Sequence, residues 1–162
     1  MDIRIATADD TPTLLAFIRA MAEFEKLEVS ATEEVLRESL FGDQPAAFPI
    51  LAFIDGEPAA YAVYFFSFST MAGKRGLWLD DLFVDPKFRG RGVAKKMMAF
   101  LADIALKKDC ARFEWMVLDW NQPAIDLYKG LGADFFPEWQ ICRLDQDNLK
   151  NVAGFGFDDT KA

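Results

Sequence analysis

The run from residue 82 to residue 94 constrains this chain most, because an apolar strand pattern leads there through a glycine turn into an amphipathic helix pattern. The turn contains Gly90 and Gly92, flanked by Arg89 and Arg91. The first N–H groups of a helix lack partners within the helix and carry a partial positive charge, and glycine lets a ligand approach the backbone. The segment therefore predicts a turn that binds a phosphate or pyrophosphate group. A glycine turn without a ligand is the alternative that the segment alone leaves open.

Two common nucleotide-binding motifs do not fit this turn. The Rossmann fingerprint needs a third glycine where Lys95 stands, and a P-loop needs Gly-Lys followed by Ser or Thr, which the chain lacks. This pattern and the short chain of 162 residues argue against an oxidoreductase that binds a dinucleotide.

Composition and charge narrow the class of protein further. With 162 residues, 52% of them hydrophobic, we expect a single domain over residues 1–162. The net charge of −8 argues against a nucleic-acid partner and suits a small cationic molecule. The chain has no apolar run of the roughly 18 residues that a membrane span needs and no signal-peptide pattern. We therefore expect a cytoplasmic protein without a membrane partner.

The absence of histidine excludes several kinds of site. Without histidine the chain has no Ser-His-Asp or Cys-His triad, and a structural zinc site is disfavoured, so we expect no metal. Cys110 and Cys142 have no metal-ligand or redox spacing and are interpreted as ordinary thiols.

Hydrophobic periodicity predicts a mixed α/β fold. Strands are expected over residues 3–6, 48–54, 59–68, 77–84 and 111–118, with a final strand or pair of strands over residues 135–144. The Asp55-Gly56 turn predicts that the second and third of these strands form a hairpin. Helices are expected from the capping segment 7–10 as far as Phe24, over residues 32–41 with Thr32 as the cap, and over residues 92–108 and 123–130. Asn121 is the expected cap of the last helix, and Gly130 and Gly132 its stop. The polar segment 146–162 is expected to be a partly loose tail.

Several motifs carry a resemblance to a known family. Arg89-x-x-Gly92-x-Ala94 resembles the [QR]-x-x-G-x-[GA] motif of the GNAT superfamily of N-acetyltransferases. Further segments resemble the diamine, or spermidine/spermine, acetyltransferase subfamily, and together they cover nearly the whole chain. They are Phe24-Glu25, Phe41-Gly42 and residues 64–66, 79–84, 88–92 and 120–129. The pattern Trp-Asn-x-Pro-x-Ile-x-x-Tyr, from Trp120 to Tyr128, is more specific than the glycine turn.

This resemblance implies a fold and an activity. The implied fold is a mostly antiparallel, twisted sheet with a splay between the strands at 77–84 and 111–118, helices on both faces, and a homodimeric assembly. The implied activity is transfer of an acetyl group from acetyl-CoA to a primary amine of a small polycationic acceptor, by direct attack in a ternary complex. The acceptor would be a polyamine, a diamine or a thialysine-like amino acid. Acetylation of protein N-terminal or lysine amines, and a non-catalytic CoA-binding domain, are the alternatives.

The resemblance also implies catalytic roles for Asp80 and Tyr128. An amine with a pKa near 10.4 arrives as ammonium and must lose a proton, and without histidine the carboxylates are the candidate bases. By resemblance, Asp80 acts through an ordered water and Tyr128 returns a proton to the CoA thiolate. Whether Asp80 or Asp81 is this base stays open. The alternatives are two solvated acids at the start of a strand for the aspartates, and a core residue for the tyrosine. Neighbouring side chains on a regular strand face opposite sides, so Asp80 and Asp81 share a cavity only at a bulge or splay.

The remaining site residues follow from the same resemblance. The implied cofactor-binding residues are Leu82, Phe83, Val84, Arg89, Gly90, Arg91, Gly92, Val93, Ala94, Lys95, Asn121, Ala124 and Tyr128. The implied acceptor-binding residues are Phe24, Glu25, Asp80 and Asp81. Apart from the resemblance, aromatic and acidic side chains can bind a cation, which makes Trp115, Trp120, Glu138 and Trp139 further acceptor-binding candidates. Three positions depart from the subfamily pattern: Phe24 replaces a tyrosine, Asp80 a longer glutamate and Ala124 a serine. A core role is the alternative for each tryptophan, and a helix cap for Asn121.

Overall fold

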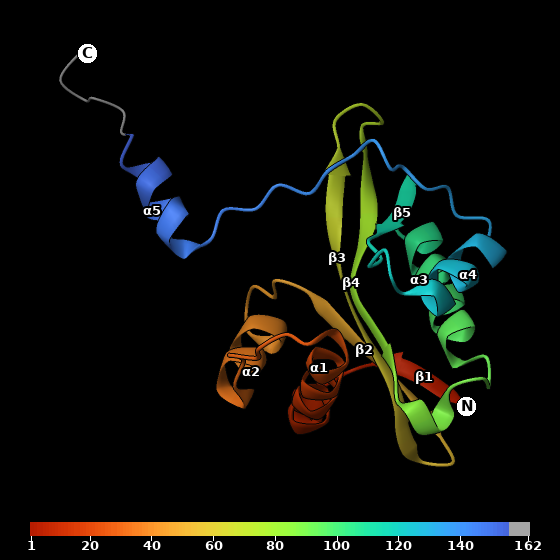
Figure 1. Cartoon of the computed structure of the whole chain (residues 1–162). Helices are drawn as coiled ribbons and strands as arrows, with labels where there is room; N and C mark the ends of the chain where they lie inside the picture. The colour runs from red at the N-terminus through yellow and green to blue at the C-terminus, as the bar shows by residue number, and fades with distance from the viewer. Residues whose placement is uncertain (156–162) are drawn as a thin grey trace. The chain divides into compact units, whose positions relative to one another are not determined.

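The computed structural model describes residues 1–155. Met1–Gln122 and Pro123–Ala162 form two compact units, the second of which is described as far as Phe155. That the whole chain is one domain stays a prediction. The first unit is built on a five-stranded sheet with strand order β1-β2-β3-β4-β5 (Figure 1).

The sheet is antiparallel except for its last pair of strands. Its strands are β1 (Asp2–Ile5), β2 (Phe48–Ile54), β3 (Glu57–Ser69), β4 (Lys74–Val84) and β5 (Arg112–Trp115), and β5 runs parallel to β4. Asp55 and Gly56, with φ of 52° and 81°, form the two-residue turn between β2 and β3. Asp-Gly is a favoured sequence for such a turn, and the hairpin predicted from it is confirmed.

A bulge and a splay interrupt the centre of the sheet. Val63 on β3 pairs with Asp81, but the next residue, Tyr64, pairs with Leu79, so Asp80 is the extra residue of a β-bulge. The pairing of β4 with β5 ends at Leu79 and Trp115. A bulge bends its strand, which accounts for β4 parting from β5 at this point. The predicted splay is confirmed, whereas the strand predicted over residues 111–118 is shorter and ends at Trp115.

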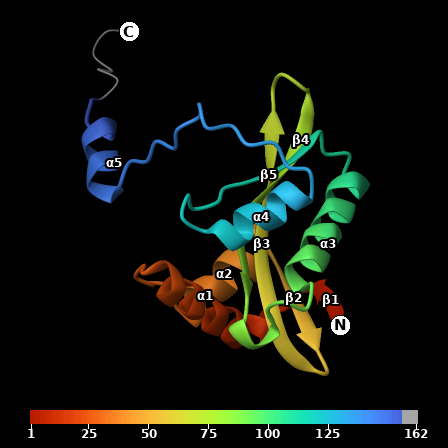
Figure 2. The same ribbon diagram turned by 45° about the vertical axis from the view of Figure 1, so that its right-hand side comes forward.

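Helices cover both faces of this sheet. They are η1 (Ala8–Asp10), α1 (Thr11–Glu25), α2 (Glu33–Phe41), η2 (Pro86–Phe88) and α3 (Val93–Lys107). Figure 2 shows α1 and α2 together on one face and α3 on the other. Thr32 caps α2 by accepting a hydrogen bond from the N–H of Val35. The predicted arrangement of helices on both faces is confirmed.

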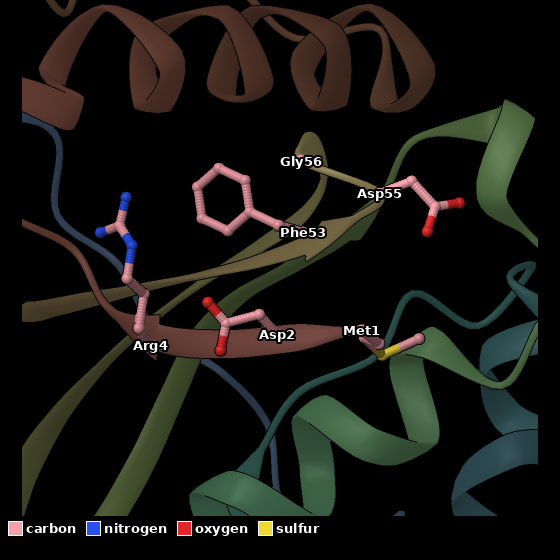
Figure 3. A pocket seen from close by; sticks show the side chains of 6 residues that line it. All are labelled: Met1, Asp2, Arg4, Phe53, Asp55 and Gly56. Carbon is pink, nitrogen blue, oxygen red and sulfur yellow. The ribbon is translucent and has the colours of Figure 1, made fainter.

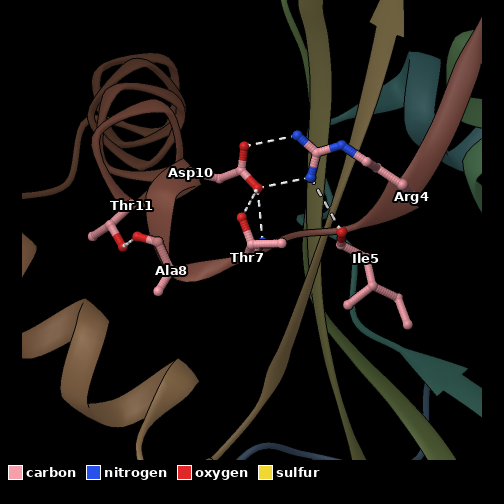
Figure 4. A network of polar contacts seen from close by, with 6 residues as sticks. All are labelled: Arg4, Ile5, Thr7, Ala8, Asp10 and Thr11. Atoms are coloured by element: carbon pink, nitrogen blue, oxygen red, sulfur yellow. Dashed lines mark hydrogen bonds and ion pairs between the residues drawn. The ribbon is translucent and has the colours of Figure 1, made fainter.

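A polar network fixes the start of α1 against β1 (Figure 4). Arg4 donates two hydrogen bonds to the Asp10 carboxylate, at 2.7 and 2.8 Å, and the N–H of Thr7 donates another at 2.7 Å. These bonds to the charged form lower the pKa of Asp10 far below its usual range. The network thereby orients α1, whose last turn carries Phe24 and Glu25.

The core of the first unit lies between α1 and the sheet. Phe17 stacks on the Tyr61 ring at 5.6 Å and meets Phe83 edge-on at 6.3 Å. Leu14 and Leu51 are fully buried in the same cluster. This packing holds β3, β4 and α1 in fixed positions around Asp81.

The second unit contains α5 (Gln146–Ala153) and all but the first residue of α4 (Gln122–Gly130). Helix α4 ends in a Schellman motif, because Ala133 and Gly132 donate their N–H groups to the carbonyls of Tyr128 and Lys129. The predicted stop at Gly132 is confirmed.

One prediction for the second unit is wrong. Residues 135–144 form no strand, because the sheet ends at β5 and no described strand supplies the partner that strand hydrogen bonds require. The first part of the expected partly loose tail, residues 146–153, forms α5, which Asp145 caps by accepting a bond from the N–H of Asn148 at 2.8 Å. The rest of that expected tail, residues 156–162, lies outside the described residues.

Candidate active site

The glycine turn leads directly into the N-terminus of α3. Gly90 and Gly92 have φ of 73° and 74°, and Gly92 is the N-cap residue of the helix. The first helical hydrogen bond runs from the N–H of Lys96 to the carbonyl of Gly92, at 3.1 Å. The N–H groups of Val93, Ala94 and Lys95 therefore precede the intrahelical bonds and are available to an anion.

Space is open in front of this turn. A Cβ atom added to Gly90 or to Gly92 would meet nothing within 4 Å. A ligand can therefore come within hydrogen-bond distance of the backbone here. The turn and the first turn of α3 fit a phosphate or pyrophosphate group.

The two arginines of the turn have different surroundings. Arg89 donates from Nε to the carbonyl of Val84 at 3.0 Å, and its guanidinium lies over the Phe24 and Phe83 rings at 5.1 and 5.5 Å. The Arg91 guanidinium lies over Phe88, at 5.5 Å from the ring centroid. Arg89 thus ties the glycine turn to the end of β4 and to the end of α1.

The edge of β4 beyond the splay is open to strand-like pairing. Leu82 and Val84 pair with β3 on one side, opposite Ala62 and Ala60. On the other side, no strand among the described residues pairs with β4 after Leu79. The backbone around Leu82, Phe83 and Val84 can therefore bind an extended ligand through main-chain hydrogen bonds.

The carboxyl groups of Glu25, at the end of α1, and of Asp80 and Asp81, at the bulge of β4, form a carboxyl cluster. Asp81 is partly buried and accepts a hydrogen bond from the Tyr61 hydroxyl at 3.0 Å, whereas Asp80 is exposed. Burial raises the pKa of Asp81 to about 6; the bond from Tyr61 opposes this shift, and the charges of Asp80 and Glu25 add to it. Burial also raises the pKa of Glu25. The bulge at Asp80 interrupts the regular alternation that would point these two aspartates to opposite faces of the sheet.

The burial of Asp81 has a cost in stability. Its pKa is about 6 in the folded chain against 3.8 for an ordinary aspartate, so the folded chain binds this proton more tightly than the unfolded chain. The stabilisation from that bound proton is fully present below pH 3.8 and is lost as the pH rises through about 6. At neutral pH Asp81 is charged, and this buried charge lowers the stability of the folded chain. Carboxyl groups with such raised pKa values are common at functional sites.

Aromatic rings lie beside the carboxyl cluster. Phe24 and Trp120 are 5.6 Å apart between ring centroids, and both are partly exposed. Trp115, on β5, packs against Phe113 at 4.8 Å and pairs with the last residue of β4 before the bulge, Leu79. The first unit thus contains the glycine turn, the open β4 edge, the carboxyl cluster and these aromatic side chains. A cation can bind at such a surface through charge and cation–π contacts.

The other predicted site residues lie on or beside the second unit. Asn121 directly precedes α4 and donates its N–H to the carbonyl of Leu118 at 2.9 Å. Ala124 and Tyr128 lie on α4; Tyr128 is buried, and burial raises the pKa of its phenol. Glu138 lies in the coil between α4 and α5 and is exposed. The roles of these four residues stay predictions.

Tyr61 is a residue that the sequence analysis missed at this site. A tyrosine in an apolar strand is usually interpreted as a core residue. A buried phenol nevertheless needs a hydrogen-bond partner. The neighbours Ala59, Ala60 and Ala62 offer no side-chain partner, which is the signal that could have pointed to Asp81.

A hollow elsewhere in the first unit is not part of this site. It has a volume of about 440 Å³ and opens beside β1 and the β2–β3 turn, where Arg4 and Phe53 line it (Figure 3). None of the predicted site residues lines it.

Within residues 1–155, no group of histidine, cysteine or acidic residues could hold a metal ion, and no helix is long and apolar enough to cross a membrane.

Comparison with known proteins places these features in a family context. The sequence matches the acetyltransferase (GNAT) family model over residues 14–133. A thialysine N-epsilon-acetyltransferase from Bos taurus is 39% identical, over 94% of this chain and 96% of the relative. A spermidine/spermine N(1)-acetyltransferase-like protein 1 from Homo sapiens is 30% identical, over 93% of this chain and 23% of the relative.

The fold also matches solved structures. An integron cassette protein from the mobile metagenome of V. cholerae has a TM-score of 0.78 and 24% sequence identity, over 94% of this chain and 96% of that chain. This likeness supports the fold alone.

Proposed function

Because the chain belongs to the acetyltransferase (GNAT) family and transfers acetyl groups to small amine acceptors, we propose acetyl-CoA as the donor and a small molecule with two cationic amines as the acceptor. The observation that carries this proposal is the carboxyl cluster of Glu25, Asp80 and Asp81 beside the open edge of β4. Carboxylates next to a partly exposed aromatic pair favour a cationic amine over a neutral or anionic acceptor.

The proposed donor site combines the glycine turn with the β4 edge. The N–H groups of Val93, Ala94 and Lys95, together with Gly90 and Gly92, would hold the pyrophosphate of acetyl-CoA, and Arg89 and Arg91 would add positive charge. The backbone of residues 82–84 would pair with the pantetheine arm, with Asn121 and Ala124 as further contacts. When bound, acetyl-CoA supplies an activated acetyl group as a thioester.

The proposed chemistry is direct attack of the acceptor amine on that thioester. Asp80 takes a proton from the ammonium through a water molecule, which its exposed position in the bulge supports. Tyr128 returns a proton to the thiolate as the carbon–sulfur bond breaks. Burial raises the pKa of Tyr128, so the phenol carries its proton at neutral pH.

The proposed acceptor is a lysine-like amino acid or a small diamine. One amine attacks while the other is held by Asp81 and Glu25, against Phe24 and Trp120. Trp115 and Glu138 are further proposed contacts. Phe24 in place of a tyrosine favours a less polar acceptor, and the thialysine N-epsilon-acetyltransferase relative, matched over nearly its whole length, supports the lysine-like choice.

An acetylation screen tests the acceptor. With acetyl-CoA as donor, thialysine, lysine, putrescine, spermidine, spermine and a peptide panel are compared by kcat/KM. We expect the lysine-like and diamine acceptors to lead. Peptides with free N-termini as the best acceptors, together with inert diamines, would contradict the proposed acceptor while leaving the acetyltransferase activity in place.

On the best acceptor, we expect Asp80→Asn to lower kcat by about tenfold to a hundredfold. The loss is partial because water remains as a residual base. The matched control is Asp103→Asn, which makes the same change of charge on the exposed face of α3, where Asp103 pairs with Lys107. Equal rates for the two variants would assign the proton transfer to another group.

The proposed assembly is a homodimer in the cytoplasm. Exposed apolar side chains support a protein contact, namely Phe68 near the end of β3 and Phe136, Trp139, Ile141 and Phe155 in the second unit. We expect sedimentation velocity at micromolar concentration to give twice the mass of the 18.3 kDa chain. A single monomeric species would contradict the dimer.

A further inference from the structure

Tyr61 is a fully buried tyrosine whose hydroxyl reaches the proposed acceptor site. Its ring stacks on Phe17 with planes 14° apart, and no part of the residue is exposed. The hydroxyl lies 3.0 Å from Oδ2 of Asp81 and 3.4 Å from Sδ of Met21. Because the ring is packed on β3 against α1, the position of the hydroxyl is fixed by the core.

The hydroxyl can serve Asp81 in both of its protonation states. A phenol has one hydrogen to donate, and a carboxylate is a much stronger acceptor than a thioether sulfur, so the hydrogen goes to Asp81 when that group is charged. When Asp81 is protonated, its own hydrogen can be donated to the Tyr61 oxygen, and the phenol hydrogen then turns to Met21. The contact therefore holds the carboxyl in one place while the charge changes.

We propose that Tyr61 is a positioning residue for the amine acceptor, because its hydroxyl holds the Asp81 carboxylate in the orientation and charge state that binds the cationic nitrogen. This role rests on the proposed function, in which Asp81 holds the amine that does not react. Tyr61 itself does not touch the acceptor; it acts through Asp81.

The groups that face Asp81 give Tyr61 a distinct electrostatic effect. Glu25 from α1 and Asp80 from β4 both disfavour the charge on Asp81, as does its burial. The bond from Tyr61, on β3, favours that charge and lowers the pKa. Met21, from α1, is neutral. Loss of the hydroxyl should therefore move the pKa of Asp81 upward from about 6, into the range where enzymes are assayed.

The test compares Tyr61→Phe with Tyr64→Phe. Tyr64 is the matched control, because it is buried on the same strand but packs against Phe48 and Phe66 and lies outside the proposed site. We expect Tyr61→Phe to move the acidic limb of the kcat/KM profile for the acceptor upward by about one pH unit. At pH 6.5 the charged fraction of Asp81 should fall about threefold, so the KM for the acceptor should rise about threefold, with kcat and the KM for acetyl-CoA nearly unchanged. Tyr64→Phe should keep the wild-type profile.

A second measurement does not depend on catalysis. Carbon-13 NMR follows the titration of the Asp81 carboxyl, whose resonance is identified by its loss in Asp81→Asn. We expect this resonance to titrate at a higher pH in Tyr61→Phe than in the wild-type and Tyr64→Phe proteins. An unchanged titration, or an acceptor KM that rises equally at all pH values, would overturn the role of Tyr61. A wild-type enzyme that acetylates no amine overturns the proposed function instead, and the NMR titration then decides for or against the Tyr61–Asp81 coupling alone.

Discussion

Replacing Tyr128 by phenylalanine is expected to lower kcat by a hundredfold or more, with little change in the KM for acetyl-CoA. The substitution removes one oxygen from a buried side chain and keeps the ring, so the packing of α4 is retained. What is lost is the proton that stabilises the departing thiolate in the transition state, and general acids contribute roughly 10²- to 10⁴-fold to rates. An interaction made only in the transition state lowers kcat and kcat/KM together.

Steady-state kinetics with varied acetyl-CoA and acceptor check this expectation. Tyr64→Phe is again a suitable control, because it removes the hydroxyl of another buried tyrosine. Circular dichroism and thermal unfolding establish that both variants fold. Turnover within a few-fold of the wild-type rate would make Tyr128 a core tyrosine and would assign the proton donor to another group.

The glycine turn was predictable from sequence because its causes are local. Gly90 and Gly92 adopt positive φ values, and the apolar pattern before and after them fixes a strand and a helix. Each of these signals spans only a few residues. For the same reason the Asp55-Gly56 hairpin and the Thr32 cap of α2 were predicted at the right places.

The carboxyl cluster depends on a contact that sequence does not encode locally. Whether Asp80 and Asp81 share one cavity is decided by the register of β4 against β3, and a bulge shifts that register by one residue. Sequence reasoning could state this condition but not choose between its outcomes. Tyr61 was missed for the same reason, since its partner Asp81 lies 20 residues further along the chain.

Over residues 135–144 a strand was predicted that does not form. The aromatic and branched residues of this segment have a high strand propensity, yet a strand is stable only when another strand satisfies its backbone groups. Strand β5 is short for a related reason, because β4 bends away at the bulge after Leu79. Strand propensity therefore predicted where strands could form, and pairing decided where they did.

Replacing Gly92 by valine is expected to weaken acetyl-CoA binding by more than a hundredfold. Gly92 is the N-cap of α3, with a φ of 74°, and a side chain there would fill the open space that the pyrophosphate is proposed to occupy. Valine at a positive φ also strains the backbone, at a cost of about 1–3 kcal/mol in folding free energy. Isothermal titration calorimetry gives the loss of affinity, and chemical denaturation gives the loss of stability.

Gly56→Val separates these two effects. Gly56 has a φ of 81° in the β2–β3 turn, and a Cβ atom added there would also meet nothing within 4 Å. The two variants therefore carry similar backbone strain in similarly open surroundings, but Gly56 lies outside the proposed donor site. A similar loss of stability in both variants, with acetyl-CoA affinity lost only in Gly92→Val, assigns the effect to the ligand's position. Micromolar affinity retained in Gly92→Val would mean that the turn shapes the chain without binding the pyrophosphate.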